Sequence, residues 1–66
     1  MSNARQLRQQ RGLSIAALSH EILDNASTLS SVERRKIAAS KNVRRKLSEF
    51  FSVPESQLFD TDGLAI

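Results

Sequence analysis

Residues 14–33 read SIAALSHEILDNASTLSSVE, and they contain the signals of two short helices joined by a tight turn. Ser14 is a favoured N-cap residue, because its hydroxyl can accept a hydrogen bond from a free N–H of the first helical turn. Apolar residues three and four positions apart follow it, at Ile15, Leu18 and Ile22. This spacing puts them on one stripe of a helix that begins after Ser14.

Asp24 and Asn25 interrupt this apolar pattern, since both residue types favour turns and caps over helix interiors. Asn25 is the better candidate to cap a third helix that begins at residue 26, with Leu29 and Val32 on its inner side. No residue from 34 to 39 breaks a helix. We therefore expect the third helix to cover about residues 26–35. The sequence does not define where beyond residue 35 it ends.

The sequence on both sides of this stretch predicts further helices. Ser2 or Asn3 can cap a first helix that runs to about Arg11, where Gly12 supplies a stop. Ser40 can cap a fourth helix, whose inward residues would be Val43, Leu47, Phe50 and Phe51.

Pro54 suits the first position of a short fifth helix, because its missing N–H costs nothing there. Leu58 and Phe59 would close this helix onto the core. The last seven residues, DTDGLAI, look like a frayed tail. The expected fold is all-α, a compact bundle of about five short helices over residues 1–59, followed by a C-terminal tail over residues 60–66.

Composition narrows the class of protein. Sixty-six residues suffice for one domain. The chain has no Cys, so it offers no disulfide and no thiolate metal site, and an intracellular setting fits best. Its single His, His20, cannot form a metal site by itself. It has no phosphate-cradling glycine loop and no paired carboxylates for acid–base chemistry, so we expect no enzyme and no cofactor. No apolar run approaches the roughly 20 residues of a membrane span.

The charge is unevenly distributed along the chain. The net charge is +3, and seven of the ten bases fall between residues 34 and 46. No base follows Lys46, and the remaining chain carries acids only. The pattern indicates one basic face and one acidic end. A solvated helix surface is the alternative for such a run.

The order LRQQRGLS (residues 7–14), continued by the pattern of residues 14–33, resembles the lambda-repressor/Cro-like (Xre-type) helix-turn-helix DNA-binding family. Residues 47–59, LSEFFSVPESQLF, are similar to the end of that family's domain. The resemblance covers roughly residues 5–59 and implies a lambda-repressor-like fold, with the helix from residue 26 as the recognition helix.

Four positions depart from the family pattern, and the first is a mild change, Ser19 where the family prefers Ala. Leu23 stands where the family prefers Gly at the tight turn, so we expect a remodelled turn in which Asn25 takes the positive dihedral angle. Arg35 stands where Gly often follows the recognition helix, so we expect that helix to be longer. Ile15 occupies a position that is normally polar and close to a DNA phosphate.

The candidate DNA site has two parts. Ser27, Ser31 and Arg34 or Arg35 share one face of the third helix by their spacing. The resemblance implies base-edge contacts from Ala26, Ser27, Thr28 and Ser31, and Arg34 is the side chain best able to read guanine with two hydrogen bonds. Phosphate contacts are expected from the helix N-terminus at Ser14 and from basic or polar side chains further on, at Arg35, Lys36, Lys41, Asn42, Arg44 and Arg45.

The resemblance also implies an ion pair between Arg8 and Glu33, which would link the first helix to the recognition helix. An ordinary surface position is the alternative for Glu33.

We expect a sequence-specific regulator of transcription in the cytoplasm of a bacterium or a phage-infected host, a small Cro-like or phage-type repressor. Its partner would be double-stranded operator DNA, palindromic if the protein binds as a weak homodimer through the edge formed by residues 51–66. No membrane and no small-molecule substrate is expected. The competing class is a protein-interaction module of the same fold, an antitoxin or anti-repressor, which Ile15, Leu23 and Leu64 would favour if exposed.

Overall fold

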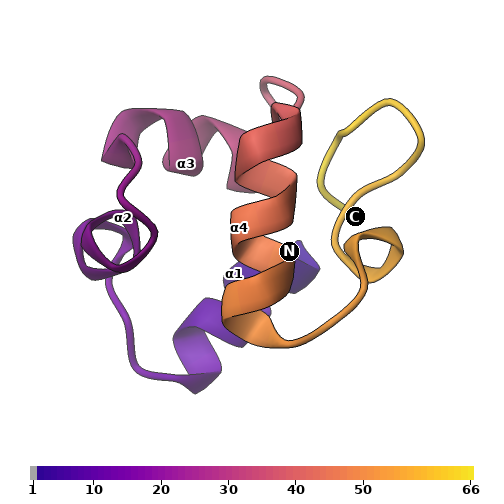
Figure 1. The fold of residues 1–66 in the computed structure, drawn as a ribbon. Helices are drawn as coiled ribbons and strands as arrows, with labels where there is room; N and C mark the ends of the chain where they lie inside the picture. Colours follow the sequence, from indigo (N-terminus) through magenta and orange to yellow (C-terminus); the bar gives the residue numbers. More distant parts are fainter. Residues whose placement is uncertain (1) are drawn as a thin grey trace.

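The computed structural model describes residues 2–66 as a compact, all-helical domain (Figure 1). In this part of the chain there are four α-helices and one short 3-10 helix: α1 (Asn3–Gln10), α2 (Ile15–Ile22), α3 (Ala26–Glu33), α4 (Lys41–Phe51) and η1 (Glu55–Gln57). The expectation of about five helices is therefore wrong in its last member, which is a three-residue 3-10 turn. Pro54 precedes η1 as its N-cap rather than forming its first residue.

Each α-helix begins at a short polar side chain that caps it. Ser2, Ser14, Asn25 and Ser40 each accept a hydrogen bond from the backbone N–H three residues further on. Such a bond satisfies one of the free N–H groups of the first turn and contributes about 1 kcal/mol. The hydroxyls and the amide therefore fix the helix starts that the sequence predicts.

All four α-helices also end in one way, with a residue in the left-handed conformation. These residues are Gly12, Leu23, Arg35 and Ser52, with φ angles of 69°, 55°, 60° and 57°. In each case its N–H and the next N–H bond back to the last carbonyls of the helix. At α3, for example, Arg35 N donates to Val32 O (3.0 Å) and Lys36 N to Ser31 O (2.9 Å). This is the Schellman motif, usually built with Gly.

Two expectations from the sequence, for the ends of α2 and α3, are wrong. Leu23 itself takes the positive φ, whereas Asn25 has a φ of −81°. The left-handed conformation costs a non-Gly residue about 1–2 kcal/mol. Likewise, α3 ends at Glu33 and does not extend past Arg35, which adopts the turn conformation despite having a Cβ.

The core lies where α1, α2 and α3 meet α4, which stands at the centre of the view in Figure 1. Its fully buried large side chains come from α2, α3, α4 and the end of η1: Leu18, Leu29, Val32, Leu47 and Leu58. In the same view α2 is seen end-on while α3, above it, runs sideways, so the two helices are steeply inclined to each other. None of the helices in residues 2–66 is long and apolar enough to cross a membrane.

Residues 60–66 do not form a frayed tail. Phe59 and Ala65 form an antiparallel β-bridge, and Ala65 is completely buried. Asn3 N donates to Ile66 O (2.6 Å), so the two ends of the described chain lie side by side (Figure 1). The DTDG sequence makes a turn in which Asp60 Oδ1 accepts from Asp62 N (2.9 Å) and Leu64 N (3.0 Å). This closed turn folds the segment back onto the domain.

Candidate nucleic-acid interface

The helix α3 buries one side and presents the other to solvent. Leu29 and Val32 are 1% and 0% exposed, respectively. On the opposite side Ser27 is exposed and Ser31, one turn later, is half-buried. We call Ser27, Ser31 and Arg34 the outward face of α3. The remaining two base-contact candidates, Ala26 and Thr28, lie in the first turn and are half-buried.

The only acid of α3, Glu33, points inward and forms an ion pair with Arg8. Its carboxylate accepts two hydrogen bonds from one guanidinium, from Arg8 Nε to Oε2 (2.9 Å) and from Arg8 Nη2 to Oε1 (3.1 Å). The side chains of Arg8 and Glu33 are 13% and 6% exposed. The ion pair implied by the resemblance is thus present, and a surface position for Glu33 is ruled out. Arg8 Nη1 also donates to Leu13 O (2.7 Å), which ties α1 to the segment before α2.

Arg34 directly follows α3 and is exposed. Its Nη2 donates to the hydroxyl of Ser30 (3.1 Å), one turn earlier on the same helix. This bond lays the guanidinium back along α3, over a hollow of about 470 Å³ that Arg5, Ser14 and Ile15 also line. Arg34 can therefore reach a base only by releasing Ser30.

The phosphate candidates fall into two groups. Ser14 is exposed at the N-terminus of α2, and its Oγ accepts from Ala17 N (3.0 Å), which leaves other N–H groups of that turn free. Lys36, Lys41 and Asn42 are exposed and make no ion pair among the residues that the structure describes. These four positions are available to an anionic partner.

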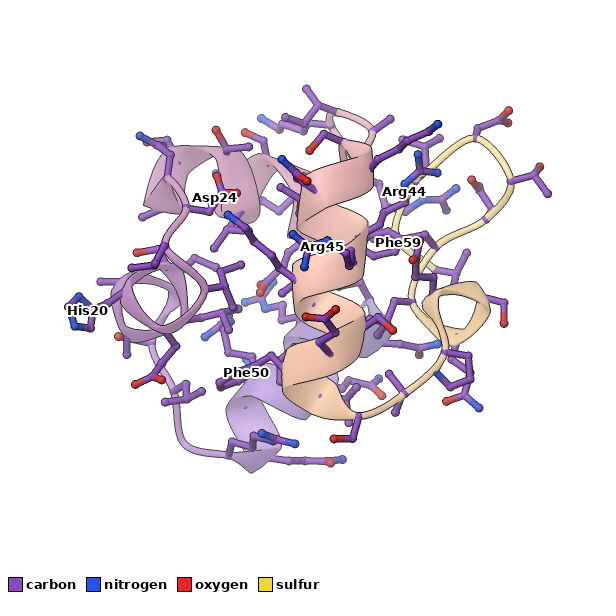
Figure 2. All side chains as sticks on the ribbon, viewed as in Figure 1. His20, Asp24, Arg44, Arg45, Phe50 and Phe59 are labelled. Carbon is purple, nitrogen blue, oxygen red and sulfur yellow. The ribbon has the colours of Figure 1, made fainter. Side chains whose placement is uncertain are left out.

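Two of the three arginines of the second group pair with carboxylates of the chain. Arg45 lies 3.3 Å from Glu49 on an exposed turn of α4, and Arg35 lies 4.0 Å from Asp60. Arg44 leaves α4 on the side of the C-terminal segment, as Figure 2 shows, and its Nε is buried without a hydrogen-bond partner. Arg44 and Arg45 therefore leave α4 in different directions, although both belong to one charge run in the sequence.

Two contacts that sequence reasoning missed hold the elements around α3. Lys46 Nζ donates to Leu23 O (3.3 Å) and lies 3.5 Å from Asp24, so α4 supports the turn between α2 and α3. The second is the contact of Asp60 with Arg35, at 4.0 Å. The turn that begins at Asp60 could have been predicted from the DTDG sequence, because Asp and Gly are typical turn residues. No sequence signal marks the Lys46 contact.

Within residues 2–66 no group of three or more metal-ligating side chains is assembled. No protein-family model, no curated protein and no solved structure matches the chain.

Proposed function

We propose that the chain is a sequence-specific regulator that binds double-stranded DNA, with α2 and α3 as a lambda-repressor-like helix-turn-helix and α3 in the major groove. One observation carries the proposal: α3 presents no negative charge outward. Its single acid is 7% exposed and paired with Arg8. An apolar inner side with a hydroxyl-rich outer side of short residues fits a groove that is wide enough to admit a helix.

Base recognition is assigned to Ala26, Ser27, Thr28, Ser31 and Arg34. The short side chains allow the helix to approach the base edges closely, and the hydroxyls donate or accept, so each discriminates weakly. The methyl groups of Ala26 and Thr28 can contact a thymine methyl. Arg34 would supply the strongest discrimination once it leaves Ser30 and forms two hydrogen bonds to guanine.

Phosphate contacts are assigned first to Ser14, Lys36, Lys41 and Asn42, because these are exposed and free of carboxylate partners among the described residues. Arg35 and Arg45 can join only at the expense of Asp60 and Glu49. Each phosphate neutralised by a cation contributes about −0.9 to the log–log salt slope. Two lysines and one of the arginines would therefore give a slope of about −3.

A small repressor of this kind is expected to bind a palindromic operator as a weak dimer. The edge formed by residues 51–66 supports this arrangement, because it contributes to an uncharged hollow of about 270 Å³. Its lining is apolar and carboxamide: Asn3, Gln6, Leu7, Gln10, Val53, Gln57, Leu58 and Ile66. Two copies that meet at this hollow bring no charged side chain of its lining against another.

A protein-interaction module of the same fold, an antitoxin or anti-repressor, is the second candidate, and Leu23 favours it. Its side chain is 81% exposed, and its backbone takes a conformation that is costly for leucine. Ile15 and Leu64 do not add to this argument, because both are half-buried.

Selection of bound sequences from a random duplex pool, at two salt concentrations, tests the proposal. Enrichment of a palindrome supports a sequence-specific dimer. Binding without enrichment that weakens steeply with salt would point to a non-specific DNA binder. Absence of binding at low salt would overturn the DNA proposal and leave the protein-interaction module.

A further inference from the structure

The loop that joins α3 to α4, residues 34–40, is held by the C-terminal segment, residues 59–66. Ala39 N donates to Gly63 O (2.8 Å). Of the backbone N–H groups of residues 37–40, only that of Ala39 donates a hydrogen bond within the described chain. Ala39 is also 5% exposed, whereas residues 36–38 on its N-terminal side are exposed. This hydrogen bond, together with the Arg35–Asp60 ion pair (4.0 Å), ties the loop to the C-terminal segment.

Gly63 lies close against the 34–40 loop. Its φ is +84°, and a Cβ built there would lie 3.1 Å from Ala39 O and 3.5 Å from Ala38 Cβ. A separation of 3.1 Å to a backbone oxygen is tight, so a methyl group there requires the 34–40 loop to move by a few tenths of an ångström. Glycine is therefore needed here for two reasons, the backbone angle and the close approach.

The C-terminal segment is itself anchored on the far side of Gly63. Ala65 is completely buried, and Ile66 N donates to Leu58 O (3.0 Å). The Asp60 carboxylate closes the turn through Asp62 N and Leu64 N, as described above. The segment can thus act as a rigid support for Ala39.

We propose that Gly63 is a positioning residue for DNA binding. The C-terminal segment holds Ala39 in place and so sets where the ammonium groups of Lys36 and Lys41, three and two residues away, meet the phosphates. This inference rests on the proposed function, since it assigns a role in DNA binding to residues remote from α3. It makes binding depend on a segment that touches no nucleic acid.

Gly63→Ala tests the inference, with Gly12→Ala as its matched control. Gly12 also has a positive φ (+69°), but a Cβ there would meet nothing within 4 Å. Both variants carry the backbone cost, and only Gly63→Ala displaces the loop. The readouts are amide hydrogen exchange of Ala39 and of Leu47 in α4, the Kd for an enriched duplex, and the salt slope of that Kd.

We expect Gly63→Ala to speed exchange at Ala39 about tenfold more than at Leu47 and to raise the Kd about tenfold beyond Gly12→Ala. The salt slope should shrink by about 1 to 2, as phosphate contacts of Lys36 and Lys41 are lost. Ala65→Gly is a second variant, in case Gly63→Ala does not fold. It loosens the segment by deleting a buried methyl, adds no bulk and changes no charge, and the same pattern is expected on a smaller scale.

Equal Kd values and salt slopes for the Gly63→Ala and Gly12→Ala variants, or an unchanged slope for Ala65→Gly despite faster Ala39 exchange, would overturn the positioning role and leave the DNA proposal intact. If the unaltered chain does not bind DNA at low salt, the proposed function fails and this inference fails with it.

Discussion

The guanidinium of Arg8 in α1 forms two parallel hydrogen bonds with the carboxylate of Glu33 at the end of α3, at 2.9 and 3.1 Å. A third bond from the same side chain, to Leu13 O at 2.7 Å, reaches the segment that leads into α2. One arginine therefore connects three parts of the domain. A buried pair of this kind contributes more to the orientation of helices than to net stability.

Arg8→Met should destabilise the domain strongly, because it leaves the Glu33 carboxylate buried without its partner. The expected loss is about 3–5 kcal/mol in the free energy of unfolding, measured by urea denaturation. The double variant Arg8→Met/Glu33→Leu should recover most of this loss, since an apolar pair can replace a buried ion pair. Its affinity for DNA should nevertheless stay low, because α3 has lost its link to α1. Unchanged affinity in folded Arg8→Met would show that the pair does not orient α3.

Leu23→Gly should raise the stability of the protein by about 1 kcal/mol, because glycine takes the left-handed conformation without the steric cost. Little burial is lost, since the Leu23 side chain is 81% exposed. Thermal unfolding measures the gain, and Leu23→Ala is the control, which keeps a Cβ and should gain nothing. DNA affinity should not change; a marked loss of DNA affinity in Leu23→Gly would mean that this side chain belongs to the interface.

The hydroxyls on the outward face of α3 should affect sequence preference rather than general affinity. Ser27→Ala and Ser31→Ala should each reduce discrimination against a mismatched operator, by up to about 1–3 kcal/mol where a bond to a base is lost. Binding to unrelated duplexes should stay the same. Gln9→Ala, an exposed change in α1, is the control. If both α3 variants discriminate as well as the control, base reading by these hydroxyls is excluded.

Lys36→Ala and Lys41→Ala should weaken binding to all duplexes about equally and reduce the log–log salt slope by about 0.9 each. Lys46→Ala removes the same charge from α4, but Lys46 is held by Asp24 and Leu23 O, so its slope should stay near that of the unaltered chain. Titrations at several salt concentrations give the slopes. A larger effect from Lys46 than from Lys36 or Lys41 would reverse the assignment of phosphate contacts.

The starts of the helices could be predicted from the sequence and their ends could not. Ser14, Asn25 and Ser40 each cap a helix through their own side chains, so a local signal suffices. The ends at Leu23, Arg35 and Ser52 use a conformation that these residues do not favour. Packing of the helices imposes the left-handed conformation against the local preference of these residues. Only Gly12, a residue type that favours this conformation, marks a helix end in the sequence.

The candidate site was predictable to a similar degree. The inward stripe of α3 follows from the spacing of Leu29 and Val32, whereas the pairing of Arg8 with Glu33 came from the resemblance and not from spacing. The partial burial of Arg44, beside the exposed Arg45, depends on where the C-terminal segment folds back. That segment is held by contacts between residues far apart in the chain, such as Ala39 with Gly63, which no local pattern encodes.

Backbone amide chemical shifts, followed during titration with an enriched duplex, test most directly whether α3 is the DNA-binding helix. We expect the largest shifts on residues 26–36, with further shifts around Ser14 and at residues 40–42. Largest shifts around Leu23 or in residues 51–66, with α3 unaffected, would contradict it.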